Sequence, residues 1–190
     1  MGKGAGDANT TAHDNTFIGT DAGGSNVTGT GNTFLGTAAG DVNTASANTF
    51  LGANAGGANT SAADNTFIGT NAGLLNVTGV SNTFIGARAG DSNTASGNTF
   101  IGKDAGGANT AGTLNTFIGS NSGAGNSTST KNTFVGASSG QVNTGELNTF
   151  IGANSGVANT GGDFNTFLGA DAGMELTITN HNTFIGATAG

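Results

Sequence analysis

Asn98-Thr99-Phe100-Ile101-Gly102, with Ala105-Gly106 and Asn109-Thr110 after it, is one copy of the pattern that decides the fold. The tripeptide Asn-Thr-Phe occurs eleven times, at steps of 16 or 17 residues, starting at Asn15, Asn32, Asn48, Asn65, Asn82, Asn98, Asn115, Asn132, Asn148, Asn165 and Asn182. A fixed period of this size is typical of a stacked architecture in which each unit contacts its neighbours. The sequence therefore predicts a solenoid.

Residue types inside each unit depend on position, counted from the first Asn. Position four is Ile, Leu or Val, positions five and nine are always Gly, and position eight is Ala or Ser. A second Asn stands at position twelve of most units, and the one-residue difference in length follows it, so we expect a loop there. Glycine in register at 22 sites, two per unit, indicates repeated turns with φ > 0 rather than a flexible linker.

Local propensities favour strands over helices. Thr, Phe, Ile and Val are strand formers, and a unit of 16 or 17 residues fits two short strands and two tight turns. Each glycine inside a helix would cost about 0.5–1 kcal/mol relative to alanine. Turns stacked about 4.7–4.9 Å apart would make a rod roughly 50 Å long, with ladders of Asn side chains along it.

The predicted fold class is all-β, a parallel β-solenoid or β-roll of about 11 turns with two short strands per turn. Residues 1–190 form a single repeat array, with a partial N-terminal turn at 1–14, ten full repeats at 15–181 and a partial C-terminal turn at 182–190. Met1 stands where a repeat carries Ile, so we expect the chain to be a block of a longer array.

Adjacent residues of a strand point to opposite sides, which separates two apolar rows. We expect one row to fill the narrow interior as the structural core: Phe17, Phe34, Phe50, Phe67, Phe84, Phe100, Phe117, Phe134, Phe150, Phe167 and Phe184. The other then lies outside as the candidate oligomer interface: Ile18, Leu35, Leu51, Ile68, Ile85, Ile101, Ile118, Val135, Ile151, Leu168 and Ile185. A local bend that turns both rows inward is the alternative. Self-association is favoured, because burying one Phe per turn stabilises by roughly 1.5–3 kcal/mol, far less than the cost of ordering a unit.

Composition excludes several classes of function. The net charge is −7, from four Lys and Arg against eleven Asp and Glu, and no basic stripe is present for nucleic acid or for an anionic membrane surface. No stretch approaches the roughly 20 apolar residues of a spanning helix, so we expect no membrane insertion by this fragment. The chain has no Cys, which excludes disulfides and thiolate metal sites.

No catalytic or metal-binding constellation is visible. His13 and His181 lie near opposite ends of the array, in loop positions and without a partner cluster. Ser122 lies in Gly119-Ser120-Asn121-Ser122-Gly123, where it fills the small eighth position of its unit. The acidic residues form no continuous row, and the Gly-rich nonapeptide that binds calcium is absent. We expect no enzyme activity, no metal and no cofactor.

An Asn, a small hydroxyl residue, an apolar residue and then Ile-Gly resemble the YadA-like head repeats of trimeric autotransporter adhesins. The units resemble more closely the Asn-Thr-Phe-Ile-Gly repeat regions of bacterial surface proteins and of phage tail fibres with an endosialidase-type chaperone domain. The resemblance covers Asn15 to Gly190 and, less completely, Met1 to Asp14. It departs from the YadA-like pattern in that Phe and Ile are adjacent, where that pattern alternates apolar and small residues.

The resemblance implies a left-handed β-roll packed as a homotrimer. It also implies an extracellular place on a cell or virion surface and a structural or adhesive role, as an adhesin head or a tail-fibre shaft. Its partners would then be further copies of the chain and a host receptor or glycan.

Ice binding is the alternative function, because one Thr per unit forms a straight row beside the apolar position four. A regular lattice of Thr methyl and hydroxyl groups next to apolar side chains would order water into an ice-like layer. The row is Thr16, Thr33, Thr49, Thr66, Thr83, Thr99, Thr116, Thr133, Thr149, Thr166 and Thr183.

Overall fold

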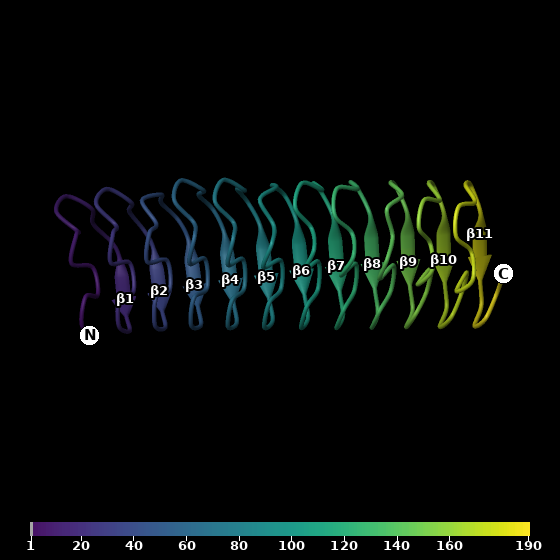
Figure 1. The fold of residues 1–190 in the computed structure, drawn as a ribbon, viewed down its shortest axis with the longest axis horizontal. Helices are drawn as coiled ribbons and strands as arrows, with labels where there is room; N and C mark the ends of the chain where they lie inside the picture. The colour runs from purple at the N-terminus through teal and green to yellow at the C-terminus, as the bar shows by residue number, and fades with distance from the viewer. Residues whose placement is uncertain (1) are drawn as a thin grey trace.

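The computed structural model describes residues 2–190, which wind into a stack of similar turns that runs along the long axis of Figure 1. Every turn contributes one three-residue strand to a single parallel sheet ordered from β1 to β11. The strands are β1 (Thr16–Ile18), β2 (Thr33–Leu35), β3 (Thr49–Leu51), β4 (Thr66–Ile68), β5 (Thr83–Ile85), β6 (Thr99–Ile101), β7 (Thr116–Ile118), β8 (Thr133–Val135), β9 (Thr149–Ile151), β10 (Thr166–Leu168) and β11 (Thr183–Ile185). The predicted parallel β-solenoid is confirmed.

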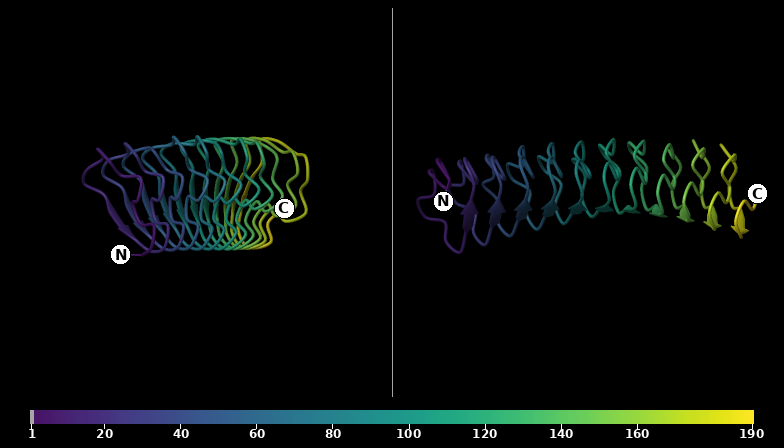
Figure 2. Two further views of the ribbon diagram at one scale, coloured as in Figure 1. Left: turned by 60° about the vertical axis from the view of Figure 1, so that its left-hand side comes forward. Right: turned by 90° about the horizontal axis from the view of Figure 1, so that it is seen from below.

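Equivalent residues of neighbouring turns pair with one another throughout the sheet. In β5 and β6, for example, Thr83 pairs with Thr99 and Phe84 with Phe100. Figure 2 shows from below that the resulting rod is long and gently bowed. Residues about 17 apart in sequence thus become immediate neighbours along the rod.

The expectation of two strands per turn is wrong, because residues 2–190 form only one strand in each turn. The part of each turn between one strand and the next, here called the returning half, alternates backbone hydrogen bonds to the next turn with backbone hydrogen bonds inside its own turn. Gly23 N–H donates to the next turn at Ala39 O, whereas Gly24 N–H donates back to Asp21 O in its own turn. Asp21 and Gly23 also have positive φ, of 56° and 59°. Such a chain of tight turns is bonded to its neighbours but never becomes extended.

A column of phenylalanine rings fills the interior of the rod. The rings from Phe34 to Phe150 are fully buried, whereas the end members Phe17 and Phe184 are less completely covered. Successive rings lie nearly parallel, with centroid separations from 4.7 Å (Phe150 to Phe167) to 5.1 Å (Phe17 to Phe34). Each ring therefore packs between the rings of the two adjacent turns.

Glycine and small residues make room for this column. A Cβ on Gly106 would lie 2.5 Å from ring atoms of Phe100, and φ there is +59°. Ala105 beside it is fully buried. Only a residue without a side chain fits at position nine, because the ring of the same turn occupies the space.

Two rows of Asn side chains complete the interior. In the first row the backbone N–H of each Asn donates to the side-chain oxygen of the Asn one turn earlier, as Asn115 does to Asn98 at 2.9 Å. In the second row Asn109 Nδ2 donates to Asn93 Oδ1 at 2.7 Å and to Gly112 O at 2.9 Å. These bonds satisfy backbone and amide groups that no water reaches.

The second Asn row also absorbs the difference in unit length. Asn26 Nδ2 reaches Gly29 O, three residues on, in a 17-residue unit. Asn43 Nδ2 reaches Ala45 O, two residues on, in a 16-residue unit. The loop after position twelve thus gains or loses a residue while the strand keeps its register.

Candidate functional site

The outer surface of the sheet is the most regular feature of the exterior. Each strand buries its central Phe and directs the Thr before it and the apolar residue after it outward, as in Thr49–Leu51. We call the surface formed by these two rows the strand face; it runs the full length of the rod in Figure 1. The local bend that would turn both apolar rows inward does not occur in β1 to β11.

The apolar row of the strand face is open to solvent along the whole rod. Ile18 is 49% exposed and Ile151 is 39% exposed, while Ile85, Ile101 and their neighbours in the central strands are half-buried. Large apolar patches on the surfaces of soluble proteins commonly serve interactions, which makes this row the candidate site.

The Thr row of the strand face carries unused hydrogen-bonding groups. Within residues 2–190 its hydroxyls, such as that of Thr99, form no hydrogen bond. A second Thr row on the returning half of the turn behaves differently, since Thr94 Oγ1 donates to Thr110 O at 2.7 Å. The hydroxyls of the strand face are therefore free for a partner or for ordered water.

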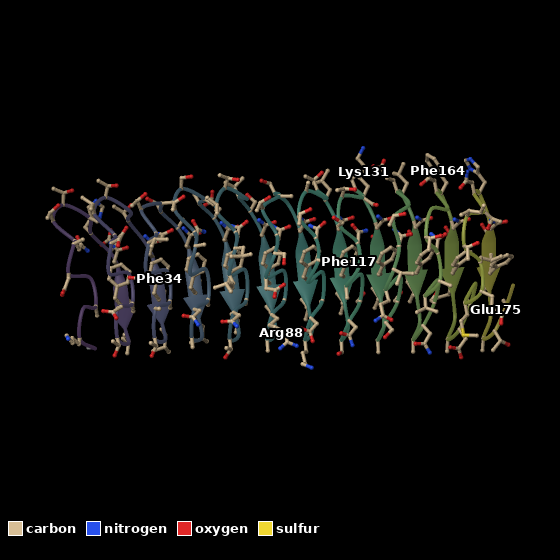
Figure 3. All side chains as sticks on the ribbon, viewed as in Figure 1. Phe34, Arg88, Phe117, Lys131, Phe164 and Glu175 are labelled. Carbon is tan, nitrogen blue, oxygen red and sulfur yellow. The ribbon has the colours of Figure 1, made fainter. Side chains whose placement is uncertain are left out.

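The lower edge of the rod, which follows the strands, carries polar pairs between turns. Arg88 donates to Asp104 in a two-pronged ion pair, with 2.6 Å from Nε to Oδ1 and 2.9 Å from Nη2 to Oδ2 (Figure 3). The hydrogen bond from Arg88 lowers the pKa of Asp104. Asn154 Nδ2 donates a single hydrogen bond to Asp171 Oδ1 at 2.9 Å. Exposed pairs of this kind contribute little to stability.

The upper edge, which precedes the strands, carries the last residue of each unit. Lys131 and Phe164 protrude there in Figure 3. We call this row the ridge; it consists of Asp14, Gly31, Ala47, Asp64, Ser81, Gly97, Leu114, Lys131, Leu147, Phe164 and His181. Sequence reasoning missed it, although the change from small to large residues at Leu114 is visible in the aligned units.

The residues examined for chemistry are dispersed. His13 and His181 are both exposed, and His13 Nδ1 contacts only Asp14 Oδ2, at 2.7 Å. Ser122 is fully buried, and its hydroxyl donates to Phe134 O at 3.2 Å. Residues 2–190 contain no pocket and no group of three or more side chains that could hold a metal ion. In the part of the chain described, no helix is long and apolar enough to cross a membrane.

Comparisons with models of protein families, with curated proteins and with solved structures find no match to this chain.

Proposed function

We propose that the chain is a non-catalytic structural and adhesive rod that packs against further copies of itself through the strand face. One observation carries this: the apolar row of the strand face points outward in every turn, exposed in β1 to β3 and β9 to β11 and half-buried in β4 to β8. Covering this stripe would remove apolar surface from water, at roughly 25 cal/mol per Å² buried. It would also give the free Thr hydroxyls hydrogen-bonding partners in a neighbouring chain.

The proposed assembly is a homotrimer of left-handed β-rolls, as the resemblance to adhesin heads and tail-fibre shafts implies. Three strand faces turned toward a common axis would bury the stripes of all copies at once. The returning halves of the turns would then form the outer wall. The proposed place is a cell or virion surface, where a long stiff rod holds its outer loops toward a receptor or glycan.

The first test is the mass of the chain in solution, measured by light scattering. We expect a mass near three times the 18.1 kDa of one chain. Ile85→Asp with Ile101→Asp places two carboxylates on the strand face without touching the Phe column, and should reduce the mass to that of one chain. Burial of an unpaired charge in an interface is strongly unfavourable.

The matched control is Leu75→Asp with Val142→Asp. Both residues are exposed, at 50% and 43%, but lie on the returning half of the turn. This variant should keep the mass of the parent. A parent that is monomeric, or an Ile85 and Ile101 variant that keeps its mass, contradicts assembly through the strand face.

Ice binding is the second candidate, and the free hydroxyls of the Thr row favour it. Thr83 and Thr99 pair in register along the sheet, and their hydroxyls form no hydrogen bond within residues 2–190. A rank of evenly spaced methyl and hydroxyl groups could hold an ordered layer of water. This function uses the same surface as self-association, so it requires the strand face to stay uncovered.

Thermal hysteresis and the shape of growing ice crystals test this second candidate. An ice-binding rod should separate the melting and freezing temperatures and facet the crystals, and Thr83→Lys with Thr99→Lys should abolish both effects. No hysteresis from the parent chain at high concentration removes ice binding as a function.

A further inference from the structure

The ridge changes character along the rod. Its members from Asp14 to Gly97 are small or short acidic residues, whereas those from Leu114 to His181 are all large. Every non-glycine member has φ between 56° and 61°, a region that favours Gly, Asn and Asp and is unusual for bulky side chains. The same positive φ occurs at Asp21 and its equivalents in the other units, so the repeat imposes this backbone and the ridge is distinguished by its pattern of side chains.

The large members project into solvent in an ordered row. Leu114 is 58% exposed and Phe164 is 50% exposed. The Phe164 and His181 rings stack with centroids 4.9 Å apart and an angle of 4° between their planes. From Gly31 onward the backbone N–H of each member donates to the previous turn, as Lys131 does to Thr113 O at 3.0 Å, so the spacing of the ridge follows the turns.

The ridge of one rod is complementary in size and charge to the ridge of a second rod that runs in the opposite direction. When a second rod lies antiparallel against it, with a two-fold axis through Gly97, each large residue meets a small one and each basic or imidazole side chain meets a carboxylate. The facing pairs are Ser81 with Leu114, Asp64 with Lys131, Ala47 with Leu147, Gly31 with Phe164, and Asp14 with His181.

A parallel arrangement of two ridges lacks this match. At equal register it would place Asp64 against Asp64, Lys131 against Lys131 and Phe164 against Phe164. Like charges at short range repel, and they select against wrong partners and orientations. The pattern of the ridge therefore distinguishes the direction of the partner rod.

We propose that the ridge is a homotypic docking surface that joins two copies of this chain side by side and antiparallel. It goes beyond assembly through the strand face, because it uses the upper edge and joins rods that point in opposite directions. Rods attached to two facing surfaces meet in that orientation, so the ridge would link those surfaces. Each contact is shallow and exposed, and many rods acting together provide the strength.

Charge reversal on coated beads tests the proposal directly. One variant carries Asp14→Lys with Asp64→Lys, and the other carries Lys131→Asp with His181→Asp. Beads coated with the parent chain should cluster, and beads coated with either variant alone should cluster about tenfold less or not at all, because in either variant the pair of Asp64 and Lys131 becomes a pair of like charges. Mixing the two kinds of variant beads should restore clustering, since each reversed charge then faces an opposite one.

Single cysteines test the direction of the pair, and the chain has no Cys of its own to interfere. With a short thiol cross-linker, Ser81→Cys and Leu114→Cys should each fail to cross-link alone and should cross-link when mixed. Each protein is made in two forms, with and without Ile85→Asp and Ile101→Asp. The form with these two substitutions lacks assembly through the strand face, so any cross-linking in it comes from the ridge.

Three results would overturn the ridge proposal: parent beads that do not cluster, mixed folded variants that do not recover clustering, or either cysteine variant cross-linking to itself more than to the other. Circular dichroism identifies any charge variant that has failed to fold, and in that case the cysteine pair decides. Loss of the trimer alone would contradict the strand-face assembly and leave the ridge pairing intact.

Discussion

Single residues in this rod have roles that depend on whether neighbouring turns cover them. Phe100 and Phe164 are the same residue type, yet the first is fully buried in the column and the second is half exposed on the ridge. Truncation of a buried Phe to Ala typically costs about 3–5 kcal/mol, through lost transfer energy and the cavity left behind. The exposed ring leaves no such cavity, and within its own chain it stacks on the ring of His181.

Amide groups at this scale also differ in their surroundings. Asn109 is bonded to Asn93 and Gly112, whereas both side-chain polar atoms of the buried Asn126 lack a partner within residues 2–190. Unpaired buried amides oppose folding, because they lose their bonds to water without replacement. The ladder is therefore uneven in strength, and the turn around Asn126 is one of its weaker points.

The carboxyl groups give a pH-dependent prediction at the residue scale. Burial raises the pKa of Asp41, and the nearby charge of Asp21 raises it further. A carboxyl whose folded-state pKa is raised favours folding at pH values below its unfolded pKa, and this contribution is lost as pH rises through the folded pKa. Asp41→Asn should therefore raise the melting temperature at pH 7 and make little difference near pH 3, measured by circular dichroism.

Asp104→Asn should change the melting temperature in the opposite direction, because the pKa of Asp104 is lowered and not raised. The hydrogen bond from Arg88 lowers the pKa of Asp104, so its contribution is present at neutral pH and lost as pH falls through the folded pKa. This variant should lower the melting temperature at pH 7 and have less effect in acid. Equal shifts for the two variants at pH 7 would contradict the assigned environments.

At the scale of the turn, glycine after the strand is the element that sets the bend. Gly102 has φ of +135°, and a Cβ there would lie 2.5 Å from the backbone C and O of Gly119 in the next turn. Neither the conformation nor the space accepts a side chain. The two adjacent turns approach so closely at this point that the whole row must be glycine.

Gly102→Ala should therefore destabilise the rod by about 1–3 kcal/mol. Gly107→Ala, five residues on, is the matched control, because its nearest neighbour would be Asp104 O at 3.4 Å and its φ is not positive. We expect the control to change stability by less than about 0.5 kcal/mol. Chemical denaturation followed by circular dichroism measures both, and equal losses would contradict the steric argument.

The whole molecule is a one-dimensional stack with two distinct long surfaces. Each turn contacts the turns before and after it, so stability is approximately a sum of similar neighbour terms. The strand face repeats with little change from turn to turn, which suits a partner of the same period but does not define an axial position. The ridge varies along the rod and has a centre at Gly97, so it can specify both position and direction.

The two surfaces separate two kinds of association in the proposed function. The strand face would build the rod assembly from parallel copies, and the ridge would join rods that meet from opposite sides. Substitutions on one surface are expected to leave the other unaffected, because Ile85 and Ile101 lie on the outer face of the sheet and the ridge lies on the upper edge.

Part of this fold was predictable from the sequence because its signals repeat locally. The eleven Asn-Thr-Phe segments, the invariant glycines and the alternation within the strand lead to a parallel stack of turns. The expectation of a second strand failed for a local reason: positive φ at Asp21 and Gly23 breaks the returning half into tight turns. Propensity alone does not reveal positive φ at a residue such as Asp21, where several conformations are open.

The periodic sequence by itself determined that equivalent residues would stack, since a fixed period this short is typical of units that bury their apolar face only against their neighbours. Only the tertiary structure decided that the apolar row is exposed, that the hydroxyls beside it are free, and that the last residues of the units form one edge. Residues 16 or 17 apart have no contact in an extended chain. Stacking brings them about 4.8 Å apart, and a row becomes a surface only at that spacing.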